Sequence, residues 1–263
     1  MVMKTYKKLG DKNSIWRLLI SKGDKLLLET RDEDKKIVHF YTSELNKGNN
    51  KLEEIPHEQD YWVGVENFND DYLITHGFAK PDMPGHLGIA VYSFADKKYL
   101  WEDKTAVFLF RKGNSIFSFQ QKFDSRSYTE LDIETGSLIS EYGDDHISIK
   151  NLMNEAREAE DYSMYGFPNP ASSDSSLSPL NLENDNPINV EFLNYNDYIL
   201  YSYHVATSDK YDNFLKVYKS GKLAESLKLN IGTERLIAES WFMYKDLLIT
   251  IENKKMLKIY RLD

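Results

Sequence analysis

The chain has 263 residues, of which 41% are hydrophobic and 13% aromatic, so it can bury a substantial core and is not disordered as a whole. Its formal net charge of -9 argues against partners that need a broad basic surface, such as duplex DNA or an anionic membrane. The absence of cysteine excludes disulfide bonds, thiolate metal sites and a cysteine nucleophile.

Five stretches of the chain share one layout, in which four short apolar strands follow one another through turns and one longer loop. The second stretch is the clearest, with strands at 61–65, 72–75, 88–92 and 99–101. The middle of the second strand recurs at similar intervals except between the third and fourth copies, where the interval is about twice as long; these markers are Leu27, Leu73, Ile116, Ile199 and Leu248.

Repeats of about 40–50 residues with four strands each are typical of propeller blades, because a single four-stranded sheet must stack against neighbours to cover both of its faces. We therefore predict an all-β fold, a five-bladed β-propeller of four-stranded blades, forming a single domain over residues 1–263. Six blades, one of them degenerate, is the alternative, because the chain length suits either number.

The last copy supplies only three strands, at 236–244, 247–252 and 256–262. A fourth is available at the other end of the chain, at residues 3–9. Pairing of the two termini would close the ring and hide a sheet edge. A frayed tail over residues 1–10 is the alternative.

Residues 143–187 account for the double interval and are predicted to be an insertion between the third and fourth blades. They hold four of the seven prolines, a serine-rich run at 172–176 and one helical pattern at Ile149, Leu152, Met153 and Ala156. Acids far outnumber bases here, so most of the net negative charge of the chain lies in this insertion. This favours a cationic partner, although charge that keeps an insertion soluble is the alternative.

In a four-stranded blade the loops that join strands two and three emerge on the same face as the connections between blades. The long segments 31–36, 79–87, 143–187 and 205–213 all belong to these two classes, whereas the other turns are minimal. We expect this loop-rich face to bind a protein or peptide, so our leading hypothesis is a non-catalytic binding or scaffold module. The candidate binding residues are Arg31, Asp32, Asp82, Met83, His86, Glu158 and Asp161.

The expected protein is a cytoplasmic monomer. We expect no membrane segment, because charged residues interrupt every apolar run, and no nucleic-acid partner, because the formal net charge is -9. The alternative function is a hydrolase acting on a small or carbohydrate substrate in the central funnel, through Glu66, Glu191 or Glu239 at comparable positions in three blades. Salt bridges from these acids to Arg17 and Arg111 are the simpler interpretation.

A third hypothesis is a metal site, since His76 ends a second strand and His86 opens the third strand of the same blade, with Asp82 between them. No HxH or HExxH motif supports it, and structural histidines are far commoner, so we assign no metal ligand and expect no cofactor. The chain also lacks a GxSxG elbow and a phosphate-binding loop.

The second copy combines Trp62-Val63-Gly64-Val65, the run 80–89 and Tyr99-Leu100-Trp101-Glu102, and the third copy has Ile133-Glu134-Thr135-Gly136. With these motifs the chain resembles an uncharacterised bacterial family of single-domain propeller-like proteins. The motifs are also similar to strand ends of WD-type and quinoprotein-type propellers. Because Ser140 replaces the expected tryptophan and Asp96-Lys97 replaces Thr-Gly, the resemblance argues against a quinone cofactor. It implies a propeller fold and no known activity.

Overall fold

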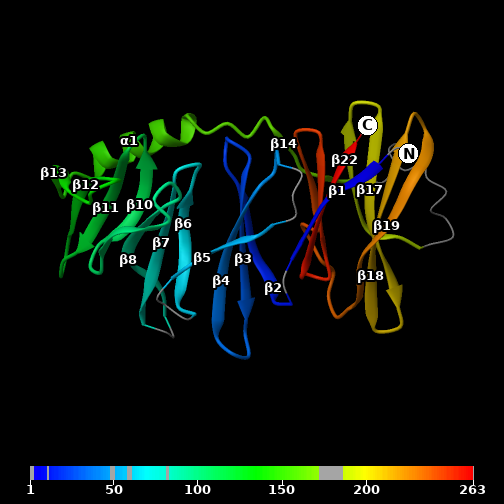
Figure 1. Ribbon diagram of the computed structural model, residues 1–263, viewed down its shortest axis with the longest axis horizontal. Helices are drawn as coiled ribbons and strands as arrows, with labels where there is room; N and C mark the ends of the chain where they lie inside the picture. The colour runs from blue at the N-terminus through cyan, green and yellow to red at the C-terminus, as the bar shows by residue number, and fades with distance from the viewer. Residues whose placement is uncertain are drawn as a thin grey trace. The chain divides into compact units, whose positions relative to one another are not determined.

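The computed structural model describes residues 3–10, 12–47, 51–57, 61–80, 83–171 and 186–262, without the side chains of residues 80, 83 and 84. Within these residues the chain is all-β apart from one α-helix, as predicted (Figure 1). Contacts along the chain define two units. The middle unit comprises residues 16–47 and 52–161, and the terminal unit comprises residues 1–15, 48–51 and 162–263.

The middle unit contains three four-stranded sheets, each with its strands in chain order. The first sheet is formed by β2 (Ser14–Ile20), β3 (Lys25–Asp32), β4 (Ile37–Glu44) and β5 (Glu53–Ile55). The second is formed by β6 (Val63–Phe68), β7 (Tyr72–Lys80), β8 (Met83–Ser93) and β9 (Lys98–Asp103). The third is formed by β10 (Val107–Lys112), β11 (Ser115–Gln121), β12 (Arg126–Asp132) and β13 (Leu138–Gly143).

The second sheet is buried on both faces, which explains its near-continuous apolar strands. Leu73 and Ile74 are neighbours on β7, and successive side chains of a strand point to opposite faces. Both are fully buried, Leu73 with Val38 and Phe40 of the first sheet, and Ile74 with Ile116 of the third. The sheets of the middle unit are therefore stacked face to face.

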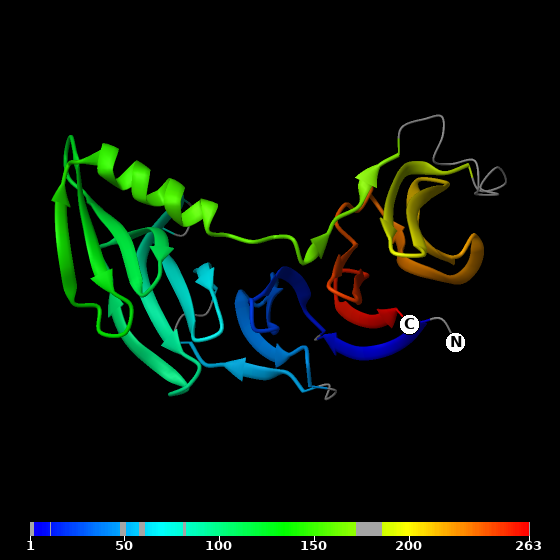
Figure 2. The ribbon, with the colours of Figure 1, turned by 90° about the horizontal axis from the view of Figure 1, so that it is seen from above.

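The single helix, α1 (His146–Glu158), follows β13 and covers the third sheet, as Figure 2 shows. Asp145 caps its N-terminus by accepting a hydrogen bond from the backbone N–H of Ser148 at 3.0 Å. Ile149 is buried against Phe110 and Phe117. The helical pattern predicted from the sequence is confirmed. This helix is too short and too polar to span a membrane, and the described residues form no other helix.

The terminal unit contains two sheets. One has the order β15 (Asn169–Pro170), β16 (Ile188–Tyr195), β17 (Tyr198–Thr207), β18 (Lys210–Lys219) and β19 (Lys222–Thr233). The other has the order β1 (Met3–Gly10), β22 (Met256–Leu262), β21 (Leu247–Glu252), β20 (Trp241–Tyr244) and β14 (Tyr165–Gly166). Leu200, Val217 and Leu229 of the first sheet form one core with Trp241, Met243 and Leu248 of the second.

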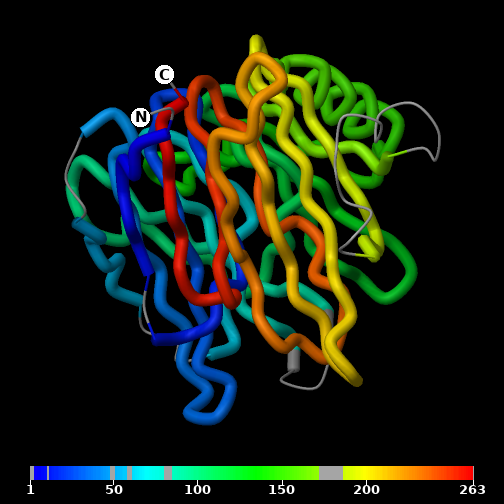
Figure 3. Tube along the Cα trace, turned by 90° about the vertical axis from the view of Figure 1, so that its right-hand side faces the viewer, coloured from blue at the N-terminus to red at the C-terminus, as the bar shows by residue number. Residues whose placement is uncertain are grey.

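The predicted pairing of the chain termini is confirmed. Strands β1 and β22 run antiparallel from Met3↔Leu262 to Gly10↔Met256, and they lie side by side in Figure 3. Two details differ from expectation. Strand β20 begins at Trp241 rather than at residue 236. The predicted insertion also contributes one short edge strand to each sheet, β14 beside β20 and β15 beside β16. These strands cover edges of β20 and β16 that would otherwise expose backbone hydrogen-bonding groups.

Candidate metal centre

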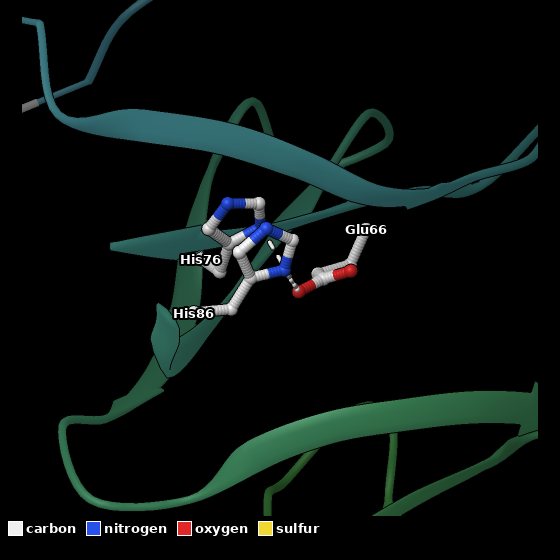
Figure 4. Close-up of side chains that lie close together, drawn as sticks. All are labelled: Glu66, His76 and His86. Carbon is white, nitrogen blue, oxygen red and sulfur yellow. Dashed lines mark hydrogen bonds and ion pairs between the residues drawn. The ribbon is translucent and has the colours of Figure 1, made fainter. Parts of the chain in front are cut away.

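Three adjacent strands of the second sheet bring Glu66, His76 and His86 together (Figure 4). Strand β6 pairs with β7 so that Gly64 lies opposite His76, and β7 pairs with β8 so that Phe78 lies opposite His86. Glu66 Oε1 is 2.7 Å from His86 Nδ1 and 3.0 Å from His76 Nδ1. The potential ligand atoms of the three residues all lie within 4.8 Å of one another.

The two imidazoles are stacked, with ring centroids 3.6 Å apart and an angle of 12° between their planes. The space for His76 exists because its partner on β6 is a glycine. A Cβ on Gly64 would lie 2.6 Å from His76 Cε1 and 2.7 Å from His76 Nε2, which is too close for any side chain. Gly64 therefore positions one of the two histidines.

Aromatic side chains enclose the cluster on one side. The ring of Phe78 packs edge-on against His76 at 5.1 Å and against His86 at 5.7 Å between centroids. Trp62 packs against Phe78 in turn, at 5.9 Å. These contacts hold the imidazoles in place and keep water away from the inner histidine.

Glu66 is ionised over a wide pH range. Burial by itself raises the pKa of this carboxyl group, but hydrogen bonds and charge interactions with His76 and His86 outweigh burial, so the pKa lies below its ordinary value. The arrangement thus places a carboxylate between two imidazoles.

His76 is 3% exposed, and its Nε2 makes no hydrogen bond to any residue that the structure describes. Its Nδ1 lies 3.0 Å from Glu66 Oε1 and pairs with that carboxylate. A buried polar atom without a partner costs about 1–3 kcal/mol, so such atoms are rare in folded proteins. A bound metal ion would satisfy one of these nitrogens.

Two imidazoles and one carboxylate are a donor set that suits zinc and other divalent transition metals. The side chain of His86 is 44% exposed, so this side of the cluster is open to solvent. Three protein ligands with an open side leave room for a water molecule or a substrate at the metal, as in catalytic rather than structural sites.

Arginine side chains donate hydrogen bonds to backbone carbonyl groups on the unpaired edge of β6, which has a neighbouring strand only on its β7 side. Arg31 donates from Nη2 to the carbonyl oxygen of Val63 at 2.8 Å, and Arg17 donates to the carbonyl oxygen of Val65. Glu29 is fully buried between them, 2.7 Å from Arg31 Nη2 and 3.5 Å from Arg17 Nε. This network anchors the backbone immediately before Glu66.

The residues predicted to form a binding surface do not share one environment. Arg31 is only 8% exposed, so its assignment to a surface loop is wrong, because Glu29 and backbone carbonyls hold it inside. Asp32 pairs with Lys35 at 2.9 Å in the β3–β4 hairpin, and Glu158 and Asp161 are exposed at and beyond the end of α1. Asp82 and the side chain of Met83 lie outside the described residues. Of this set, the structure brings only His86 into contact with Glu66 and His76 in the part of the chain that it describes.

The acids predicted for a hydrolase, Glu66, Glu191 and Glu239, also lie in different environments. Glu191, on β16, accepts a hydrogen bond from Ser202 Oγ at 3.1 Å. Glu239 is exposed, with a positive φ of 57°, and precedes β20 instead of lying within a first strand. Arg17 and Arg111 form no ion pair with any of the three acids in the part of the chain described. Salt bridges to them are therefore not what holds these acids.

The sequence predicts His76 beside His86 with Asp82 as the acid, whereas in the structure the acid beside them is Glu66. Strand alternation alone does not assign Glu66, because the pairing of β6 with β7 shifts between Val65 and Asn67. Elsewhere in the middle unit, a cavity of about 440 Å³ lies over β4 and β5, lined by Ile37, Val38, His39, Glu54, Ile55, Pro56 and His57. It contains a single carboxylate, so paired acids do not converge there.

Comparison with known proteins leaves the function open. The model of a domain of unknown function (DUF4905) matches residues 20–101, and no curated protein matches. Among solved structures, the chain is similar to an uncharacterised protein of Listeria monocytogenes, with 9% identity, a TM-score of 0.36, and 94% of this chain and 77% of that chain covered.

Two further structures show the same degree of likeness. The Dos1 propeller has 8% identity and a TM-score of 0.33 over 94% of this chain and 68% of its own. Hsv2 of Kluyvelomyces marxianus has 8% identity and a TM-score of 0.31 over 91% of this chain and 74% of its own.

Proposed function

We propose that this protein is a five-bladed β-propeller that binds a divalent transition metal, zinc being the best match, through Glu66, His76 and His86. One observation carries the metal proposal: three ligand atoms from adjacent strands lie within 4.8 Å of one another. The donor set, the open side at His86 and the absence of cysteine suit an ion that accepts nitrogen and oxygen ligands.

A purely structural role explains the cluster less well. A structural histidine in a β-sheet core normally has a hydrogen-bond partner at each ring nitrogen, and Nε2 of buried His76 has none among the described residues. Two stacked imidazoles would also repel each other if both were protonated. A shared metal ion removes both difficulties, since it bonds neutral imidazoles and neutralises the carboxylate.

The propeller part of the proposal rests on the sheets themselves. Among the described residues, four of the five sheets contain four strands in a meander, and in the fifth the first and last strands of the chain, β1 and β22, share one sheet with β20 and β21. That sharing is the usual way to close a ring of blades.

The metal proposal is tested by titrating metal-free protein with Zn²⁺ in a calorimeter and by metal analysis after dialysis. We expect one equivalent to bind the native protein, and binding to weaken at least a hundredfold in Glu66→Gln and His86→Gln. His39→Gln is the matched control, because His39 Nδ1 also lies 2.7 Å from a glutamate, Glu54, but outside the cluster. Equal loss in His39→Gln, or no stoichiometric binding by the native protein, would contradict the proposal.

A second candidate function is the partner-binding module expected from the loop-rich face. The observation that favours it is the exposed acidic end of α1, where Glu158 is the last helical residue and Glu160 and Asp161 follow the C-cap Ala159. Acids at a helix C-terminus oppose the helix dipole, so helix stability does not explain them. A labelled lysine-rich peptide should bind the native protein at low salt and bind the double variant Glu158→Gln/Asp161→Asn more weakly. Equal binding by the two proteins argues against this module.

A further inference from the structure

We propose that the cavity over β4 and β5 binds a small organic cation, an ammonium group carried on an apolar body, through Glu54 and His39. This site is independent of the proposed metal centre. Among the described residues only Glu66, His76 and His86 bring three potential ligand atoms within 4.8 Å of one another, so the cavity lacks the convergent donors of a metal site. The proposal is carried by the shape, the free polar atoms and the charge of the cavity.

The cavity lies where strand β5 stops short of the beginning of β4. The two strands pair at Tyr41↔Glu54 and at one position on each side, and the next residue of the chain after β5 is Pro56, which has no backbone N–H to continue the ladder. His57 then reaches β4 with its side chain, and its Nε2 lies 2.8 Å from the carbonyl oxygen of Val38. Its Nδ1 is shielded from solvent, so this ring offers a ligand no free polar atom. A space of about 440 Å³ is left beside the part of β4 that has no β5 partner.

The free polar side-chain atoms of the cavity are hydrogen-bond acceptors. His39 Nδ1 lies 2.7 Å from Glu54 Oε1. An ionised carboxylate can only accept, so Nδ1 carries the proton, and Nε2 of the neutral imidazole keeps a lone pair. The stacked ring of Tyr41, with its centroid 5.8 Å away, holds this imidazole in place. A ligand of the cavity must therefore bring donors to His39 Nε2 and Glu54 Oε2.

The charge of the cavity selects a cation among such donors. Glu54 is the single acid that lines it, and no lysine or arginine does so in the described part of the chain. The side chain of Glu54 is 54% exposed and that of His39 is 27% exposed, so both can be reached from solvent. The lysine nearest along β5, Lys97, pairs with Glu53 instead. An ammonium group supplies both the positive charge and the hydrogen-bond donors.

The rest of the lining determines what the ammonium group is attached to. Four apolar residues complete it: Ile37, Val38, Ile55 and Pro56. They favour a hydrocarbon body, because removing apolar surface from water stabilises a complex. Cavities that hold small molecules measure about 300–1,000 Å³, so a volume of about 440 Å³ suits a small amine with one ring.

Cyclohexylammonium is the probe, and cyclohexanol and cyclohexanecarboxylate share its ring without the positive charge. Each is titrated into the protein at pH 8, where an alkylamine is charged and an imidazole is neutral. Calorimetry and the ¹⁵N resonances of the histidine side chains follow binding. We expect cyclohexylammonium to bind saturably at one site and to move the Nε2 resonance of His39. Cyclohexanol should bind at least tenfold more weakly, and cyclohexanecarboxylate should not bind.

Three variants test the assignment. In Glu54→Gln, which keeps an oxygen for His39 Nδ1 but removes the charge, the dissociation constant for cyclohexylammonium should rise at least tenfold. Glu53→Gln is the matched control, because it removes the same charge at the neighbouring position of β5 and lies outside the cavity lining, so the constant should change less than threefold. His86→Gln disables the proposed metal centre and should bind cyclohexylammonium like the native protein, so this inference and the metal proposal can fail separately.

Three results would overturn the inference. The first is the absence of saturable binding of cyclohexylammonium. The second is equal binding of the three probes, which would show that charge plays no part. The third is an equal effect of Glu54→Gln and Glu53→Gln, which would show that the cation is attracted by the general charge of the surface rather than bound in the cavity.

Discussion

Replacing Gly64 with alanine is the most direct way to disturb the cluster without touching a ligand. The φ angle of Gly64 is not positive, so alanine fits the backbone of β6. Its Cβ would lie 2.6 Å from His76 Cε1, where ordinary contacts begin at 3.4 Å, so the ring must move by about 1 Å. His76 is held by the stacked ring of His86 and the edge of Phe78, so this movement disturbs the whole cluster.

The magnitude follows from two opposing effects on the free energy of unfolding. Overpacking of this kind costs about 1–3 kcal/mol. The reduced freedom of the unfolded chain returns about 0.4–1 kcal/mol when alanine replaces glycine. We therefore expect a net loss of about 1–2 kcal/mol, with Zn²⁺ affinity falling about 10–100-fold because a ligand is displaced from its bonding position.

Urea unfolding of the metal-free protein and calorimetric titration with Zn²⁺ measure the two quantities. Gly85→Ala is the matched control, since a Cβ on Gly85 of β8 would meet nothing closer than Ala79 Cβ at 3.9 Å. It should change neither quantity appreciably. If Gly64→Ala binds Zn²⁺ as tightly as the native protein, the argument that Gly64 seats a metal ligand is refuted.

Three other outcomes are expected. The pKa of Glu66 is lowered in the folded protein, so its contribution to stability is present above the ordinary value of 4.5 and is lost as the pH falls. The urea stabilities of the native protein and of Glu66→Gln should therefore converge in acid. A gap that stays constant with pH would contradict this. Burial and the bond to Glu134 raise the pKa of Tyr72 to about 12, so this phenol should ionise in an ultraviolet titration well after ordinary tyrosines, and Glu134→Gln should bring its transition to lower pH. Ile149→Ala should lower the free energy of unfolding in urea by about 2–5 kcal/mol, because Ile149 is buried under α1. Ile147→Ala, at a position 63% exposed, should lower it far less. Similar losses in the two variants would show that α1 does not pack on the third sheet.

Much of the strand pattern was predictable from the sequence. The five second-strand markers all fall inside strands, β3, β7, β11, β17 and β21, each of which pairs with the preceding strand of the chain. Apolar runs and turn residues act over a few positions of the chain, so they can be read locally. The pairing of β1 with β22 was predictable too, because the last copy lacked a strand and residues 3–9 had the right pattern.

The candidate site was only half predictable. His76 could be expected beside His86 because the two were placed on consecutive strands of one blade, although strands β7 and β8 extend through most of the predicted 79–87 loop. Glu66 could not be assigned to them in the same way, because its position depends on the register of β6 against β7, which shifts between Val65 and Asn67. A shift of one residue turns a side chain to the opposite face of the sheet.

Tertiary structure also decided which charged residues are inside. Composition and charge excluded thiolate chemistry and a broad basic surface, and repeat spacing determined an all-β chain of four-stranded units. The same sequence placed Arg31 in a solvent-exposed loop, whereas the fold buries it against Glu29 and Val63. Burial of a charge depends on a partner charge and on backbone carbonyls supplied by a neighbouring sheet. Those contacts join residues far apart in the chain, so local sequence patterns do not contain them.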